Sequence, residues 1–270
     1  MFVTLDESGI HPGSSWMAFG VLWLPDNALV PGFEAAVTKI RQDHGFWAEV
    51  KWSAVDREYI DAYLAFAEAL FGLPGLRLDV RVVKAAEIDK AKIREYNGSA
   101  GRSLAYLKFM RRTIQHRIGP RGVAIGQKDY VLLYDNVSGK DDIKQDFRNY
   151  LRSDLAAAAR AQSAEGCQFR TITNASSKVV SLLQAVDLLT GATCAAWTGD
   201  RANNHAKQSA REVLTRRIEA WRGAPLTTEN EMGPIDVWRH RWPPPAASGA
   251  GRAAKPPATA LPARPRGASS

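Results

Sequence analysis

The chain has very few cysteines and no long uninterrupted apolar run. Its two cysteines, Cys167 and Cys194, are too few and too far apart for a disulfide framework or a recognisable zinc site. No apolar run has the length that a helix needs to cross a bilayer, and the N-terminus lacks the basic region and apolar stretch of a signal peptide. We therefore expect a protein of the reducing cytoplasm, with buried or half-buried thiols and no membrane partner.

Familiar catalytic signatures are also missing. The sequence contains no Gly-rich phosphate loop, no Ser-His-Asp order and no Cys-His nucleophile pattern, which disfavours the enzyme classes built on them. The five histidines are scattered, and none is assigned to chemistry. Because no zinc finger and no aromatic, basic RNA-reading motif is present, sequence-specific recognition of nucleic acid is not indicated.

Acidic residues are absent beyond Asp236, and the composition changes shortly afterwards. Residues 243–270 are rich in Pro, Ala, Gly and Ser and contain no aromatic residue. Such a segment cannot bury enough apolar surface to offset its chain entropy, so we expect a disordered basic tail. Residues 1–242 show no internal repeat and are expected to form one domain. The net charge of +8 favours a polyanion such as nucleic acid, although the tail supplies part of it.

The hydrophobic pattern switches repeatedly between strand and helix periods. Strands are predicted over residues 1–6, 15–24, 77–83, 130–135 and 167–173. Helices are predicted over residues 31–43, 56–71, 103–118, 142–160 and 178–197. The segment 77–83 alternates as a half-exposed strand does, whereas 130–135 is a short, continuous apolar strand. This alternation of elements predicts an α/β sheet.

Two predicted strands end in carboxylates, Asp6 and Asp135. In open α/β sheets, sites form beyond the carboxyl ends of the strands, and these two side chains lie close together if the strands are neighbours. The alternative is that both belong to turns and helix caps, with Glu7-Ser8-Gly9 turning the chain after Asp6. The two strands alone do not decide between these interpretations.

Asp187 lies in a helix that is apolar around most of its circumference, which predicts that the helix is buried. An unpaired buried carboxylate is costly. Only a narrow strip is polar or small, and its residues Gln184, Asp187 and Gly191 face one way. Glycine inside a helix costs about 1 kcal/mol relative to alanine, so we expect Gly191 to allow a close approach. The alternative is that Asp187 pairs with a buried arginine or caps another element.

The segment FWAEVKWS contains a fourth candidate carboxylate, Glu49. In an extended segment, Glu49, Lys51 and Ser53 share one face. The carboxylate and the ammonium group form either a surface ion pair or, beside a phosphate-cleaving site, a metal ligand and a phosphate contact.

Four stretches together resemble the family called domain of unknown function 3800, which is similar to the ribonuclease H-like superfamily. They are DESG after the first strand, EVKWS, YDN after the mid-chain strand, and LLQAVDLLTGA near the end. No single stretch is specific, but their order and placement are distinctive. The resemblance covers residues 1–242 and excludes the tail. It implies a ribonuclease H-like mixed central sheet flanked by helices.

The resemblance also implies a cluster of acids that binds divalent metals. Asp6 would be the acid of the first strand, Asp135 that of the later strand and Asp187 that of the final helix. Glu49 would be an additional ligand, although many superfamily members supply their glutamate from within a helix. Glu7 is a further possible ligand.

These residues lead to the hypothesis of a metal-dependent nuclease. Mg²⁺ or Mn²⁺ held by carboxylates can activate water and stabilise the departing oxygen of a phosphodiester. Lys51, Lys178 at the start of the late helix, and Gln184 are the predicted substrate contacts. An outward strip with Lys108, Arg111 and Arg112 could follow a nucleic-acid backbone or be an ordinary solvated helix face.

Two other hypotheses remain open. The chain could be a catalytically inactive ribonuclease H-like module that binds nucleic acid or a protein. It could also be a phosphohydrolase of small molecules that uses the same metals. Neither the choice between DNA and RNA nor the oligomeric state follows from the sequence.

Overall fold

In the computed structural model of the chain, all the described residues belong to the unit Met1–His240. The structure describes residues 1–9, 14–87, 99–118, 129–135, 141–161, 166–199, 204–229 and 233–240. The segment 243–270, predicted to be a disordered tail, lies outside the described residues. None of the described helices is both long enough and apolar enough to cross a membrane.

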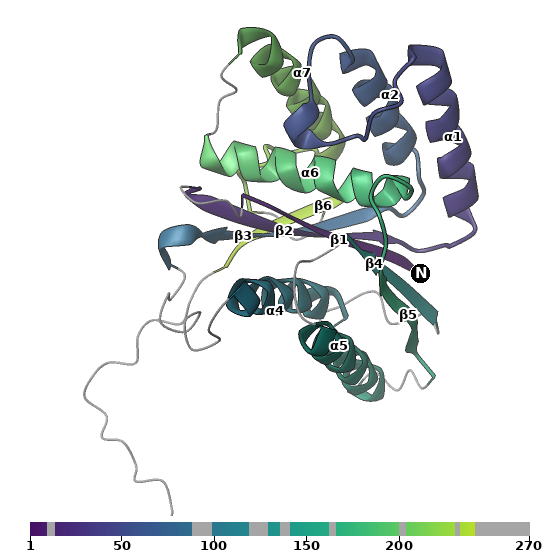
Figure 1. Ribbon diagram of the computed structural model, residues 1–270, viewed down its shortest axis with the longest axis vertical. Helices are drawn as coiled ribbons and strands as arrows, with labels where there is room; N and C mark the ends of the chain where they lie inside the picture. The colour runs from purple at the N-terminus through teal and green to yellow at the C-terminus, as the bar shows by residue number, and fades with distance from the viewer. Residues whose placement is uncertain are drawn as a thin grey trace, which may run out of the picture. The chain divides into compact units, whose positions relative to one another are not determined.

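A six-stranded mixed sheet forms the centre of this unit (Figure 1). Its strands are β1 (Phe2–Ser8), β2 (Trp16–Leu24), β3 (Arg77–Lys84), β4 (Asp129–Tyr134), β5 (Gln168–Asn174) and β6 (Ile235–Arg239). They lie in the order β5-β4-β1-β2-β3-β6. The β1–β2 and β2–β3 pairs are antiparallel, and the β1–β4, β4–β5 and β3–β6 pairs are parallel. The predicted α/β class is therefore confirmed.

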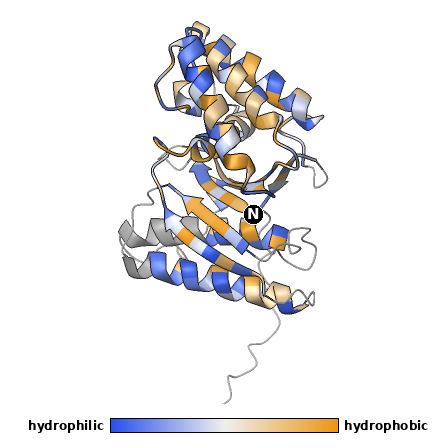
Figure 2. Cartoon of the chain, turned by 90° about the vertical axis from the view of Figure 1, so that its right-hand side faces the viewer, coloured by the Kyte–Doolittle hydropathy of each residue, from blue (hydrophilic) through white to orange (hydrophobic). Residues whose placement is uncertain are grey.

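Helices cover both faces of the sheet. They are α1 (Leu29–His44), α2 (Ile60–Phe71), α4 (Ser99–Ile118), α5 (Asp141–Ala161), α6 (Ser181–Thr198) and α7 (His205–Arg222), with two short 3-10 turns, η1 (Trp52–Ala54) and η2 (Ala85–Glu87). Helices α1, α2, α6 and α7 lie on one face, and α4 and α5 lie on the other (Figure 1). In Figure 2 the strands are rich in apolar residues, while α5 presents mostly hydrophilic residues over the first part of its length.

Helix α6 lies directly on β1 and β2, as its apolar circumference predicts. The Thr4 hydroxyl of β1 donates to the carbonyl of Leu182 at 3.1 Å. Further along the helix, a Cβ atom added at Gly20 of β2 would lie 1.8 Å from the Thr190 hydroxyl. Because only glycine permits this approach, Gly20 sets how closely α6 packs on the sheet.

The start of α6 differs from the predicted helix 178–197. Glu34 of α1 accepts hydrogen bonds from the backbone N–H of Ser181, at 2.9 Å, and from its hydroxyl, at 2.5 Å. These bonds cap the first turn, so the helix begins at Ser181. The prediction that Lys178 opens the helix was wrong. Lys178 and Val179 lie in the preceding turn, and Val179 is 77% exposed.

Strand β3 is buried on both faces, whereas the sequence predicted a half-exposed strand. Its Asp79 is fully buried and accepts a hydrogen bond from the Trp23 indole at 2.6 Å. Arg117 of α4 pairs with Asp79 and also bonds Asp236 of β6 at 2.6 Å. The charged residue Asp79 of this strand is therefore paired inside the protein. Strand β6 and helix α7 were not among the predicted elements.

Candidate metal-binding and catalytic site

The register of two parallel strands brings Asp6 and Asp135 together. Strands β1 and β4 are neighbours, and the last residues paired between them are Leu5 and Tyr134. One residue further along each strand are Asp6 and Asp135, and parallel strands lie about 4.8 Å apart. Since side chains alternate along a strand, Asp6 is on the same face as Thr4, which bonds α6. Both carboxylates thus face the layer that contains α6.

The segment 49–52 packs against the polar strip of α6. The side-chain carbonyl of Gln184 accepts a hydrogen bond from the Val50 N–H at 3.0 Å. The carboxylate of Asp187 accepts one from the Trp52 N–H, at the start of η1. A Cβ atom added at Gly191 would lie 2.4 Å from the Trp52 Cβ. The expected close approach at Gly191 is confirmed, and Asp187 also caps η1, as one alternative proposed.

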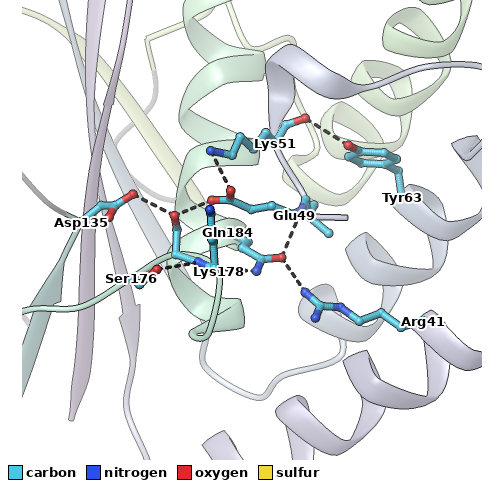
Figure 3. Close-up of polar contacts among 10 residues, drawn as sticks. Arg41, Glu49, Lys51, Tyr63, Asp135, Ser176, Lys178 and Gln184 are labelled. Carbon is cyan, nitrogen blue, oxygen red and sulfur yellow. Dashed lines mark hydrogen bonds and ion pairs between the residues drawn. The ribbon is translucent and has the colours of Figure 1, made fainter. Parts of the chain in front are cut away.

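Gln184 joins two loops beside the carboxylates (Figure 3). Its amide nitrogen donates to the Ser177 carbonyl at 2.6 Å, and its oxygen accepts from Val50 and from the Arg41 guanidinium at 3.1 Å. The residue is 1% exposed. Its amide is thus engaged by protein groups, and the predicted contact with substrate stays a prediction. Arg41 and Ser177 were not identified from the sequence because these contacts join residues far apart in the chain.

Ser177 connects two of the predicted ligands. Its hydroxyl lies 2.8 Å from Asp135 Oδ2 and within hydrogen-bond distance of Glu49 Oε1. A hydroxyl has a single proton, so it can donate to only one of these carboxylates at a time. The other oxygen–oxygen approach needs a second proton or a cation. Glu49 also accepts from Lys51 Nζ at 2.8 Å, and this hydrogen bond raises the pKa of Lys51 (Figure 3).

Asp6 and Asp187 resist ionisation. Burial is the main cause that raises the pKa of Asp6 well above its ordinary value, and the charges of Asp187 and Glu7 add to it. Burial also raises the pKa of Asp187 to about 6, with a contribution from Glu49 and partial relief from the Trp52 N–H and Lys51. Neighbouring carboxylates repel one another when ionised. Ionisation of all these carboxylates at once is therefore unfavourable unless a cation lies beside them.

Glu7 lies within β1, because the strand continues to Ser8, which pairs with Ala18 of β2. The prediction of a turn at Glu7-Ser8 was therefore wrong. The chain leaves the extended conformation at the next residue, Gly9, whose φ is 74°. Side-chain alternation places Glu7 on the face of β1 opposite to Asp6. Burial, followed by the charges of Asp135 and Asp187, raises the pKa of Glu7 to about 7.

Lys178 lies at the edge of this site, whereas the predicted basic strip does not lie near it. Lys178 is exposed in the turn after Ser177, and its backbone N–H is bound by the Ser176 hydroxyl at 3.3 Å. The basic strip on α4 lies on the other face of the sheet (Figure 1). Its Arg111 bonds both carboxylate oxygens of Asp154 in α5, at 2.6 and 2.7 Å. That arginine therefore contributes to packing between helices.

The carboxylates suit a hard divalent cation by their chemistry, because Mg²⁺ and Mn²⁺ prefer oxygen ligands. Their spacing is wider than a bound ion requires. Within the described ranges, no three His, Cys, Asp or Glu side chains converge closely enough to hold one metal ion. Binding would therefore require small movements of these side chains, including rearrangement of the contacts with Ser177 and Lys51.

No family model matches this chain, and no curated protein matches its sequence. The functional argument accordingly depends on the residues of the site.

Proposed function

We propose that the protein is a metal-dependent nuclease that hydrolyses phosphodiester bonds, with a ribonuclease H-like arrangement of its acids. One observation carries the proposal. Acids from the first strand, a mid-chain strand and the late helix, Asp6, Asp135 and Asp187, lie around one site beside Glu49. The order of these elements along the chain and the mixed sheet between the helices support the same assignment.

The electrostatic balance of the site also supports a cation. Two carboxylates, those of Asp6 and Asp187, have raised pKa values because burial and neighbouring acids disfavour their charged forms. A buried structural cluster would be more stable with neutral side chains in these positions. A divalent cation offsets this repulsion, which gives the cluster a physical reason to exist.

In this proposal Asp6, Asp135, Asp187 and Glu49 hold Mg²⁺ or Mn²⁺. The bound metal supplies an activated water and a counter-charge for the departing oxygen. Lys51, which is 40% exposed at its side chain, turns from Glu49 toward a substrate phosphate. Gln184 holds the segment with Glu49 and the loop with Ser177 together, so that only the side chains at the site need to rearrange around the metal.

The direct test is cleavage of labelled single- and double-stranded DNA and RNA in Mg²⁺ or Mn²⁺. The parent protein is compared with Asp6→Asn and Asp187→Asn, and circular dichroism verifies that each variant is folded. Asp43→Asn is the matched control, because Asp43 is an exposed acid in α1 that pairs only with Lys39 among the described contacts. We expect the parent and the control to cut and both site variants to lose activity by at least about 100-fold.

Retained cleavage in both folded site variants would overturn the proposal. If no protein cuts any nucleic acid but the parent hydrolyses nucleotides, the site is that of a small-molecule phosphohydrolase. If nothing is hydrolysed and neither metal raises the melting temperature, the inactive binding module becomes the better account.

A further inference from the structure

A tryptophan side chain projects into solvent beside the candidate site. Trp47 is 64% exposed, although burial of a tryptophan is strongly favourable. Its loop is held on both sides. The preceding Phe46 is buried and packs on the rings of Tyr59 and Tyr63, and Val50 is bonded to Gln184. The indole is therefore displayed by a fixed backbone.

A second exposed apolar side chain lies on the neighbouring loop. Among the described residues, four large apolar side chains are exposed: Trp47, Tyr150, Val179 and Val213. Trp47 lies two residues from Glu49, and Val179 lies two residues from Ser177. Since Glu49 and Ser177 are in hydrogen-bond contact, the two loops meet beside the carboxylates. Two of the four exposed side chains thus flank one site.

Gln184 holds both of these loops. It accepts from Val50 in the loop with Trp47 and donates to Ser177 in the loop with Val179. The Val179 N–H is further bound by the Ser176 carbonyl at 3.0 Å. The backbone beside both apolar side chains is therefore held in place before any ligand arrives, which reduces the entropy lost on binding.

Positive charge lies in the same loops. Lys51 is four residues after Trp47, and Lys178 immediately precedes Val179. Lys178 is exposed and Lys51 is half-exposed. An aromatic surface next to ammonium groups matches a nucleotide, which combines a flat base with a phosphate. A purely apolar partner would make no use of either ammonium group.

We propose that Trp47, with Val179 on the neighbouring loop, is a stacking platform for an unpaired base, so that the site takes single-stranded nucleic acid. This inference rests on the proposed function for its choice of occupant. Bases inside a duplex have their faces covered by neighbouring bases, whereas an unpaired base can stack on an indole. Lys51 and Lys178 then contact the phosphates on either side of the stacked base.

The test is fluorescence anisotropy with a labelled single-stranded 12-mer and the matched duplex, in DNA and in RNA. EDTA and Ca²⁺ are used in separate titrations in place of Mg²⁺, so that binding is measured without cleavage. The full-length parent is compared with Trp47→Ala and Trp47→Phe. Tyr150→Ala is the matched control, since Tyr150 is an exposed aromatic residue on α5, on the other face of the sheet.

We expect the parent to bind the single strand more tightly than the duplex in at least one of the two conditions. Trp47→Ala should weaken that binding by about 5- to 100-fold, the usual range for a stacked base, and Trp47→Phe should recover most of it. Tyr150→Ala should change it by less than about twofold.

The inference is overturned if the parent binds no single strand in either condition, if it prefers the duplex, or if Trp47→Ala binds as the parent does. It is also overturned if Trp47→Ala leaves binding unchanged but alters the oligomeric state, because Trp47 would then belong to a protein interface. Binding is measured apart from hydrolysis. A protein that stacks single strands on Trp47 but cuts nothing would therefore retain the inference and lose the proposed function.

Discussion

Replacement of Gly191 by alanine should set two effects on stability against each other: the higher helix propensity of alanine and the close packing of the segment 49–52 on α6. In an isolated helix, Gly191→Ala would be stabilising by about 1 kcal/mol. In this structure the new Cβ atom would lie 2.4 Å from the Trp52 Cβ and 2.7 Å from its Cγ. Ordinary contacts between carbon atoms are 3.5–4.0 Å. Trp52 must therefore move by about 1 Å.

The Trp52 Cβ cannot turn away, because it is attached directly to the backbone. The backbone N–H of Trp52 itself is hydrogen-bonded to Asp187. Overpacking of this kind costs about 1–3 kcal/mol. With the gain in propensity of about 1 kcal/mol subtracted, Gly191→Ala should lower the free energy of unfolding by up to about 2 kcal/mol. For a domain of this size, that corresponds to a fall in melting temperature of up to about 8 °C.

Gly32→Ala is the matched control. Gly32 also lies in a helix, α1, but an added Cβ would meet no atom within 4 Å. This substitution should raise the free energy of unfolding by about 0.5–1 kcal/mol. Differential scanning calorimetry and urea unfolding of both variants measure the contrast. If Gly191→Ala is more stable than the parent protein, the segment 49–52 does not pack as closely on α6 as described.

Three further substitutions test other contacts. Gln184→Leu leaves the Val50 N–H and the Ser177 carbonyl without their partner, and it should lower the free energy of unfolding in urea by about 2–4 kcal/mol. A loss below about 0.5 kcal/mol would contradict the role of Gln184 in holding the two loops together. Arg117→Met leaves two buried carboxylates unpaired and should cost about 3–5 kcal/mol, a result that unchanged unfolding would contradict. Burial, followed by the charges of Arg81 and Arg112, lowers the pKa of His240 to about 4. The native state then binds that proton more weakly than the unfolded state, so stability should fall by about 1–3 kcal/mol as the pH drops from 6.5 to 4, and His240→Asn should flatten this slope in urea unfolding.

The sequence predicted the parts of the fold that depend on local pattern. Five strands and five helices follow from periodicity, and the strip of Gln184, Asp187 and Gly191 was expected to face one way. Helix α7 was missed although Ala210, Leu214 and Ile218 repeat at helical spacing and Asn204 caps its first turn. That signal was available in the sequence.

Other features depend on partners that are distant in the chain. The alternation of β3 indicated exposure, but Asp79 is paired with Arg117 of α4, which no local pattern reveals. Glu34 of α1 determines where α6 begins. Ser177 enters the site only because the fold brings its loop to Glu49, and its own sequence context is that of an ordinary turn.

Direct titration with Mn²⁺ tests the central claim that the gathered carboxylates form one metal site. Isothermal titration calorimetry of the parent should detect binding that Asp6→Asn and Asp135→Asn each weaken by at least about 10-fold, while the surface control Asp43→Asn binds as the parent does. The account would be contradicted if the parent bound no Mn²⁺. It would also be contradicted if the Asp6→Asn and Asp135→Asn variants bound Mn²⁺ as tightly as the parent does.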